Sequence, residues 1–135
     1  MLVRKYLLIS LVFILPSIIF SQNSDKNIIY NGSFEEGPGV GSFITLREGN
    51  SIPGWVVARA TVDLNNSYME SSDGDRCIDL NGTPGIGAIE QTFFTDKGKN
   101  YKITFDMAGN PSGLPKIKKM MVYAGDQSQL FEFDI

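Results

Sequence analysis

The stretch that decides the fold runs from Gly74 to Pro111 and reads GDRCIDLNGTPGIGAIEQTFFTDKGKNYKITFDMAGNP. In it, short segments rich in β-branched and aromatic residues are separated by glycine-rich turns, a pattern typical of strands. The clearest segment is Asn100–Ala108, in which four apolar side chains alternate with polar ones. Such alternation places one face on a core and the other in solvent. The stretch therefore predicts an all-β domain.

The same pattern continues outward in both directions. It predicts further strands at Ile28–Tyr30 running toward Phe34, Phe43–Leu46, Trp55–Ala58, Val62–Leu64, Cys77–Leu80, Ala88–Phe94, Lys118–Ala124 and Leu130–Ile135. Asp96–Lys99 is expected to form a hairpin loop in which Gly98 takes a positive φ. Lys116–Ala124 fits a short helix as well as a strand. Many short strands with regular turns favour a β-sandwich or jelly roll.

The N-terminal residues 1–21 have the features of a secretory signal peptide. Arg4 and Lys5 precede an apolar run, and Pro16 interrupts it. A membrane anchor is the alternative, but the run Tyr6–Phe20 has 15 residues, whereas a bilayer span needs about 20. We therefore expect export, a secreted extracellular or periplasmic domain over residues 22–135, and no membrane span after cleavage.

Composition excludes several function classes. After removal of residues 1–21, 10 basic residues face 15 acidic ones, so a basic surface for nucleic acid is not expected. The chain has no histidine, which excludes Ser-His and Cys-His nucleophile pairs and imidazole acid–base chemistry. The one cysteine, Cys77, cannot form an internal disulfide and is interpreted as a small buried side chain. These points predict a protein that is not an enzyme.

A glycoside-acting enzyme is the catalytic alternative. It needs two carboxylates roughly 5 to 9 Å apart across a cleft, and no pair stands out in the sequence. Loss of turnover in a Glu90→Gln variant would support this alternative.

Five segments carry a resemblance to a known family: NGSFEEGP (31–38), SIPGWVV (51–57), VDL (62–64), GDRCIDLNGTPGIGAIEQTF (74–93) and YKITFDMAGNP (101–111). In this order they resemble the choice-of-anchor C family of secreted bacterial proteins, which is related to plant cell-wall proteins. The resemblance implies a galactose-binding-like jelly roll and a role at cell walls or extracellular polysaccharide. Family domains continue past the FEFD-like strand, so the closing C-terminal strands are expected to be missing after Ile135.

Two aromatic residues are candidates for stacking on a sugar ring, Trp55 and Tyr68. Trp55 is followed by two valines in a predicted strand, so core packing is the preferred interpretation. Tyr68 lies in the polar loop Asn65–Asp75 and is the better stacking candidate. The family usually has a second tryptophan in this region, where Tyr68 and Met69 stand here, and this weakens the stacking argument.

Arg76, Asp79 and Asn81 alternate along a predicted strand and into its turn. Guanidinium, carboxylate and amide groups bind sugar hydroxyls because they offer paired donors and acceptors. The alternative is that Asp79 and Asn81 cap the turn that follows through their own backbone. Asn110, before Pro111, is a further carbohydrate candidate, for which turn formation is the stronger interpretation.

Glu35 is the one candidate metal ligand. The resemblance implies that a carboxylate at the NGSFE position helps hold a structural calcium ion, with a second carboxylate from the last strand, which here would lie beyond Ile135. Calcium takes six to eight oxygen ligands. The alternative is that Glu35 and Glu36 form a solvated acidic pair.

Two functions follow from these observations. The leading expectation is a secreted, non-catalytic module that binds extracellular or cell-wall polysaccharide. The alternative is a structural or adhesive surface module that acts through protein–protein contacts, because exposed strand edges favour pairing with another chain.

Overall fold

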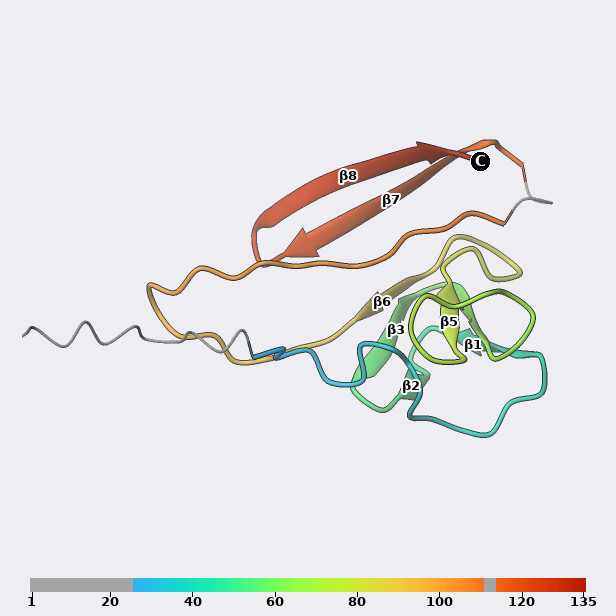
Figure 1. The fold of residues 1–135 in the computed structure, drawn as a ribbon, viewed down its shortest axis with the longest axis horizontal. Helices are drawn as coiled ribbons and strands as arrows, with labels where there is room; N and C mark the ends of the chain where they lie inside the picture. Colours follow the sequence, from blue (N-terminus) through green and yellow to red (C-terminus); the bar gives the residue numbers. More distant parts are fainter. Residues whose placement is uncertain (1–25, 111–113) are drawn as a thin grey trace, which may run out of the picture.

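The computed structural model describes residues 26–110 and 114–135, so the predicted signal peptide lies outside the described residues. In these ranges the backbone forms eight strands and no helix (Figure 1). The strands are β1 (Phe43–Arg47), β2 (Ser51–Ile52), β3 (Trp55–Arg59), β4 (Thr61–Asn65), β5 (Cys77–Asp79), β6 (Ala88–Glu90), β7 (Ile117–Ala124) and β8 (Gln127–Asp134). The prediction of an all-β domain is confirmed. Within the described ranges, no segment forms a helix that could cross a bilayer.

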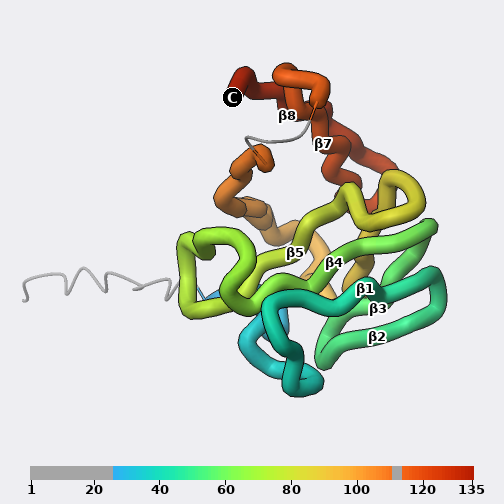
Figure 2. Tube along the Cα trace, turned by 90° about the vertical axis from the view of Figure 1, so that its right-hand side faces the viewer, coloured from blue at the N-terminus to red at the C-terminus, as the bar shows by residue number. Residues whose placement is uncertain are grey.

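Two small antiparallel sheets enclose the core, one with strand order β1-β4-β5, whose three strands are labelled in Figure 2, and the other with order β2-β3-β6. Leu46, Val62 and Leu64 come from the first sheet. Ile52 and Val57 come from the second and pack against them. Because Val62 and Leu64 are completely buried, each stabilises the fold by about 1.5–3 kcal/mol relative to an exposed side chain.

β4 is the central strand of its sheet, and its two faces differ in chemistry. Val62 and Leu64 point to the core, so the alternating residues Thr61, Asp63 and Asn65 lie on the opposite face. That face is polar and still largely covered, since Asn65 is only 1% exposed. This arrangement positions the candidate site described below.

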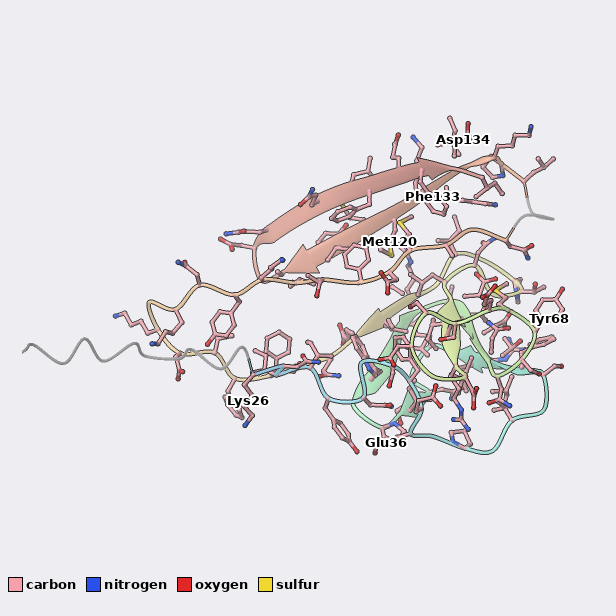
Figure 3. All side chains as sticks on the ribbon, viewed as in Figure 1. Lys26, Glu36, Tyr68, Met120, Phe133 and Asp134 are labelled. Carbon is pink, nitrogen blue, oxygen red and sulfur yellow. The ribbon has the colours of Figure 1, made fainter. Side chains whose placement is uncertain are left out.

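β7 and β8 form a separate two-stranded hairpin, paired in register from Ile117↔Asp134 to Ala124↔Gln127. The region Lys116–Ala124, which fits helix or strand in sequence, is therefore a strand. On one face, Lys119 Nζ lies 2.7 Å from Glu132 Oε1. On the other, Met120 and Phe133 point toward the chain that precedes the hairpin (Figure 3).

The prediction of a strand at Asn100–Ala108 is wrong. This segment runs beneath the hairpin without joining a sheet (Figure 1). Phe105 packs edge-on against Phe131, with ring centroids 4.9 Å apart. Side-chain alternation sets which face is apolar, but a strand also needs a neighbour to complete its hydrogen-bond ladder. Within residues 26–110 and 114–135, no strand pairs with this segment.

The strand predicted at Ile28–Tyr30 is also absent. A tight turn follows it, closed by a bond of 3.1 Å from the Phe34 N–H to the Asn31 carbonyl oxygen. The Gln91 side chain takes the place of a neighbouring strand: its Oε1 accepts from the Tyr30 N–H and its Nε2 donates to the Tyr30 carbonyl, both at 2.8 Å.

The segment Ala88–Phe94 forms a strand only over its first three residues, β6.

The remaining strand predictions are confirmed to within a few residues, and only the two-residue β2 was not expected. The predicted Asp96–Lys99 turn forms as well. The Lys99 N–H lies 3.2 Å from the Asp96 carbonyl oxygen, and Gly98 has a φ of 78°. The turn therefore exists, although the segments that flank it are not paired as a hairpin.

Candidate functional site

A pocket of about 290 Å³ opens on the polar face of β4. Most of its lining is amide, carboxylate or hydroxyl: Asp63, Asn65, Asp79, Asn81, Thr83 and Asn110. Phe43, Tyr68 and Met69 complete it with apolar surface. A pocket with a few convergent polar groups beside aromatic rings is the usual form of a small-ligand site.

Strand pairing brings these residues together from distant parts of the sequence. In the register of β1, β4 and β5, Phe43 stands opposite Asn65, and Asp63 stands opposite Asp79. The turn that follows β5 adds Asn81 to the same pocket. The predicted carbohydrate residues Tyr68, Asp79, Asn81 and Asn110 therefore share one site.

The two aspartates of the pocket face each other across neighbouring strands. The Thr45 hydroxyl donates to Asp63 Oδ1 at 2.6 Å, and the Asn81 N–H donates to Asp79 Oδ1 at 2.8 Å. The second bond is the turn-capping role foreseen for Asp79. Like charges directly opposite in a sheet are destabilising, and local conflicts of this kind are typical of functional sites.

Tyr68 forms the aromatic rim of the pocket. Its side chain is 63% exposed and lies at the outer edge of the molecule (Figure 3). Its ring is 5.6 Å from that of Phe43, at an interplanar angle of 50°. An exposed aromatic ring beside polar groups can stack on the C–H face of a sugar ring.

Glu35 holds the base of the loop that carries Tyr68. Its Oε1 accepts bonds from the N–H groups of Asp75 at 2.8 Å and Arg76 at 2.7 Å. Between β4 and these residues the chain turns at Gly74, whose φ is +74° and where a Cβ would lie 2.5 Å from Glu35 Oε1. The Ser71 hydroxyl closes the same loop by donating to the Arg76 carbonyl at 2.6 Å. Glu35 is therefore a positioning residue for this loop.

Glu35, the predicted calcium ligand, is engaged with backbone N–H groups of the described residues. Calcium needs six or more oxygens, whereas Glu35 Oε1 faces two N–H donors. In the described part of the chain, no three acidic, histidine or cysteine side chains gather as a metal site. Calcium binding at Glu35 stays a prediction.

Glu36, which follows Glu35 in the sequence, accepts a short hydrogen bond from the Tyr30 hydroxyl. This hydrogen bond raises the pKa of Tyr30.

Trp55 and Arg76, two further candidates, lie outside the pocket lining. The Trp55 indole donates to the Asn31 carbonyl at 3.0 Å, and its ring packs 5.5 Å from that of Phe34 against the core. Arg76 Nη1 is buried without a hydrogen-bond partner among the described residues. It lies 3.3 Å from where a Cβ on Gly37 would be. Both residues hold the NGSFEEGP segment to the rest of the fold.

Cys77 precedes Asp79 on the same face of β5. Burial raises the pKa of its thiol, and the negative charge of Asp79 raises it further. Both effects disfavour the thiolate. The side chain is half-buried, so the interpretation of Cys77 as a small buried residue is confirmed only in part.

Phe43, Asp63 and Asn65 line the pocket but were not predicted from the sequence. The signal that could have found two of them is the alternation in TVDLN (61–65), where the buried Val62 and Leu64 require their neighbours to share the other face. Phe43 carries no comparable signal, because its place depends on its pairing with Asn65.

Comparison with known protein families gives a match over residues 27–135 to the family described as "Protein of unknown function (DUF642)". The chain belongs to the DUF642 family. The match covers both core sheets, every residue of the pocket lining and the β7–β8 hairpin. The pocket is therefore a feature of this DUF642 domain.

Two curated proteins are similar in sequence to this chain. Halomucin of Haloquadratum walsbyi is 35% identical over 115 residues, which is 80% of this chain and 1% of halomucin. The protein DUF642 L-galactono-1,4-lactone-responsive gene 1 of Arabidopsis thaliana is 29% identical over 121 residues, 82% of this chain and 32% of that protein. The chain thus spans at most about a third of either relative. No solved structure matches the chain.

Proposed function

We propose that this DUF642 domain is an exported, non-catalytic module that binds extracellular carbohydrate in the pocket on β4. The observation that supports the proposal most directly is that Tyr68, Asp79, Asn81 and Asn110, selected from the sequence as sugar-binding residues, line one pocket. Planar amides and carboxylates pair with sugar hydroxyls, and Tyr68 supplies a stacking surface.

We further propose that the domain is a galactose-binding-like jelly roll of the choice-of-anchor C type. Two small antiparallel sheets around a shared core are compatible with this architecture. Export is proposed from the signal-peptide features of residues 1–21, and a location at cell walls or extracellular polysaccharide from the resemblance.

Incubation of the purified chain with a panel of immobilised polysaccharides tests the binding proposal. We expect at least one glycan to retain the protein. Tyr68→Ala should weaken that binding by about 1–3 kcal/mol, if a sugar ring stacks on Tyr68 as strongly as a nucleic-acid base stacks on an aromatic side chain. Tyr123→Ala is the matched control, because Tyr123 is 72% exposed on β7 and does not line the pocket. Retention by no glycan, or equal loss in both variants, would contradict the proposal.

The same incubations test the proposed lack of catalysis. We expect the bound glycan to be recovered intact. Release of new reducing ends that stops in an Asp63→Asn variant would instead make the facing aspartates a hydrolytic pair.

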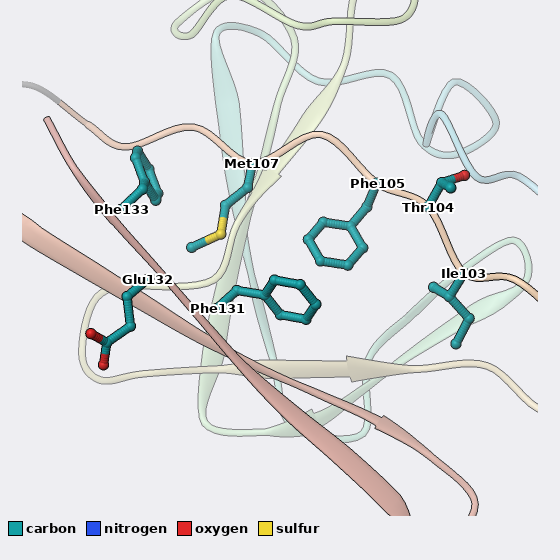
Figure 4. A pocket seen from close by; sticks show the side chains of 7 residues that line it. All are labelled: Ile103, Thr104, Phe105, Met107, Phe131, Glu132 and Phe133. Carbon is teal, nitrogen blue, oxygen red and sulfur yellow. The ribbon is translucent and has the colours of Figure 1, made fainter.

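A structural or adhesive module acting through protein contacts is the second candidate. It is favoured by an open apolar pocket of about 490 Å³, where Phe105 and Met107 point toward Phe131 (Figure 4). Exposed apolar surface of this kind often marks an interaction site. Sedimentation separates the two functions: a monomer that binds glycan supports the first, and a stable oligomer indifferent to glycan supports the second.

A further inference from the structure

The charge of the pocket on β4 constrains which glycans fit it. Asp63 and Asp79 are both acidic, and among the residues described by the structure the lining contains no lysine or arginine. The pocket therefore presents negative charge to any ligand.

Arg76, the cationic residue that precedes β5, is not part of the pocket lining. The Arg76 side chain places its Nη1 beside Gly37, and the Arg76 backbone N–H donates to Glu35 Oε1. Asp63 and Asp79 receive hydrogen bonds from Thr45 and from the Asn81 backbone. Both donors are neutral, so they orient the carboxylates without cancelling their charge.

Sugar hydroxyls and sugar carboxylates behave in opposite ways at such a site. A hydroxyl donates a short, strong hydrogen bond to an ionised carboxylate. A uronate carboxylate only accepts, and it would add a third negative charge close to two others. Like-charge juxtaposition at an interface is strongly unfavourable.

We propose that this pocket selects uncharged sugars and rejects sugars whose C6 is oxidised to a carboxylate, with Asp63 and Asp79 as the specificity-determining residues. The inference rests on the proposed carbohydrate binding, because it names the class of glycan bound at the same site. Under this proposal the two facing aspartates contribute to ligand selection, although like charges opposite each other lower the stability of a sheet.

Matched ligands provide the test. Oligosaccharides of glucan, galactan and mannan are each compared, by titration calorimetry, with the same oligosaccharide oxidised at C6. We expect a neutral oligosaccharide to bind. Its oxidised form should have an affinity at least about tenfold lower. Added salt should narrow this difference, because ions screen charges near the surface.

Two double variants test whether the affinity difference between neutral and oxidised oligosaccharides arises from the aspartates of the pocket. Asp63→Asn combined with Asp79→Asn should bring the two affinities closer together. Asp126→Asn combined with Asp134→Asn makes the same change in net charge on the β7–β8 hairpin, at residues outside the lining, and should leave the ratio unchanged. If both double variants reduced the affinity difference between neutral and oxidised oligosaccharides equally, the inference would be overturned.

The two proposals fail in distinguishable ways. If no neutral or oxidised oligosaccharide and no panel glycan binds, the proposed function fails and the inference with it. If a C6-oxidised sugar binds as tightly as its neutral form or more tightly, carbohydrate binding stands and the charge selection is wrong.

Discussion

Asp63 and Asp79 are the two acidic residues of the pocket on β4. They stand opposite each other in the register of β4 and β5, and each already accepts one neutral hydrogen bond. An asparagine at either position keeps an acceptor oxygen for that bond. The charge of the pair is therefore the property that substitution can remove while its hydrogen bonds stay.

Asp79→Asn should stabilise the unliganded protein. Removal of one of two facing like charges is expected to raise the free energy of unfolding by about 0.2–1 kcal/mol, measured by denaturant unfolding at low salt. Asp134→Asn, on β8, is the control and should have a smaller effect. A loss of stability in Asp79→Asn would show that the carboxylate is needed for the turn at Asn81.

The thiol of Cys77 should report the charge of Asp79. Burial and the charge of Asp79 both raise the pKa of the Cys77 thiol in the folded protein. Below its ordinary pKa the thiol is neutral, and its contribution to the stability of the folded protein is fully present. Stability should fall as the pH rises from that value through the folded-state pKa. Ultraviolet thiolate absorbance against pH should give a midpoint above the ordinary value.

Asp79→Asn should lower the Cys77 midpoint, since it removes the second cause of the shift. Cys77→Ala should abolish the thiol-dependent part of the alkaline loss of stability. A midpoint in the folded protein equal to that of a denatured control would contradict the burial of the thiol.

At the scale of elements, the loop that precedes β6 packs closely against β4 because residue 87 is a glycine. A Cβ on Gly87 would overlap the Thr61 carbonyl group, with the carbonyl carbon 2.8 Å away. The Gly87 N–H also donates to the Leu80 carbonyl at 2.7 Å. Backbone atoms cannot give way as a flexible side chain can, so a larger residue must displace this loop from β4.

Gly87→Ala should therefore lower the free energy of unfolding by about 1–3 kcal/mol, as overpacked sites do. Gly39→Ala is the matched control, because a Cβ there meets no atom within 4 Å. Thermal and denaturant unfolding of both variants measure the difference. Equal stability of the two would mean that the loop tolerates displacement.

At the scale of the molecule, the described chain has a packed part and a loosely packed part. The two three-stranded sheets share a buried core, whereas the β7–β8 hairpin and the segment beneath it leave many large apolar side chains exposed. Leu64 belongs to the first part and is completely buried, while Leu130 on β8 is about half exposed.

Leu64→Ala should cost about 2–5 kcal/mol, the range for a buried leucine that leaves a cavity. Leu130→Ala should stay within about 0.5–1 kcal/mol, because about half of the Leu130 surface remains in water. Denaturant unfolding of the two variants gives the comparison. A similar loss in both would show that the hairpin face is covered in solution, for example by a second copy of the chain.

The sequence by itself determined the all-β class, the position of most strands and the polar residues around β5, because alternation and turn residues are local properties. Only the tertiary structure decided that Asp63 faces Asp79, that Phe43 stands beside Asn65 and that Glu35 holds the Tyr68 loop. Strand partners and register depend on contacts distant along the chain. For the same reason the alternation in Asn100–Ala108 indicated an apolar face but not the absence of a partner strand.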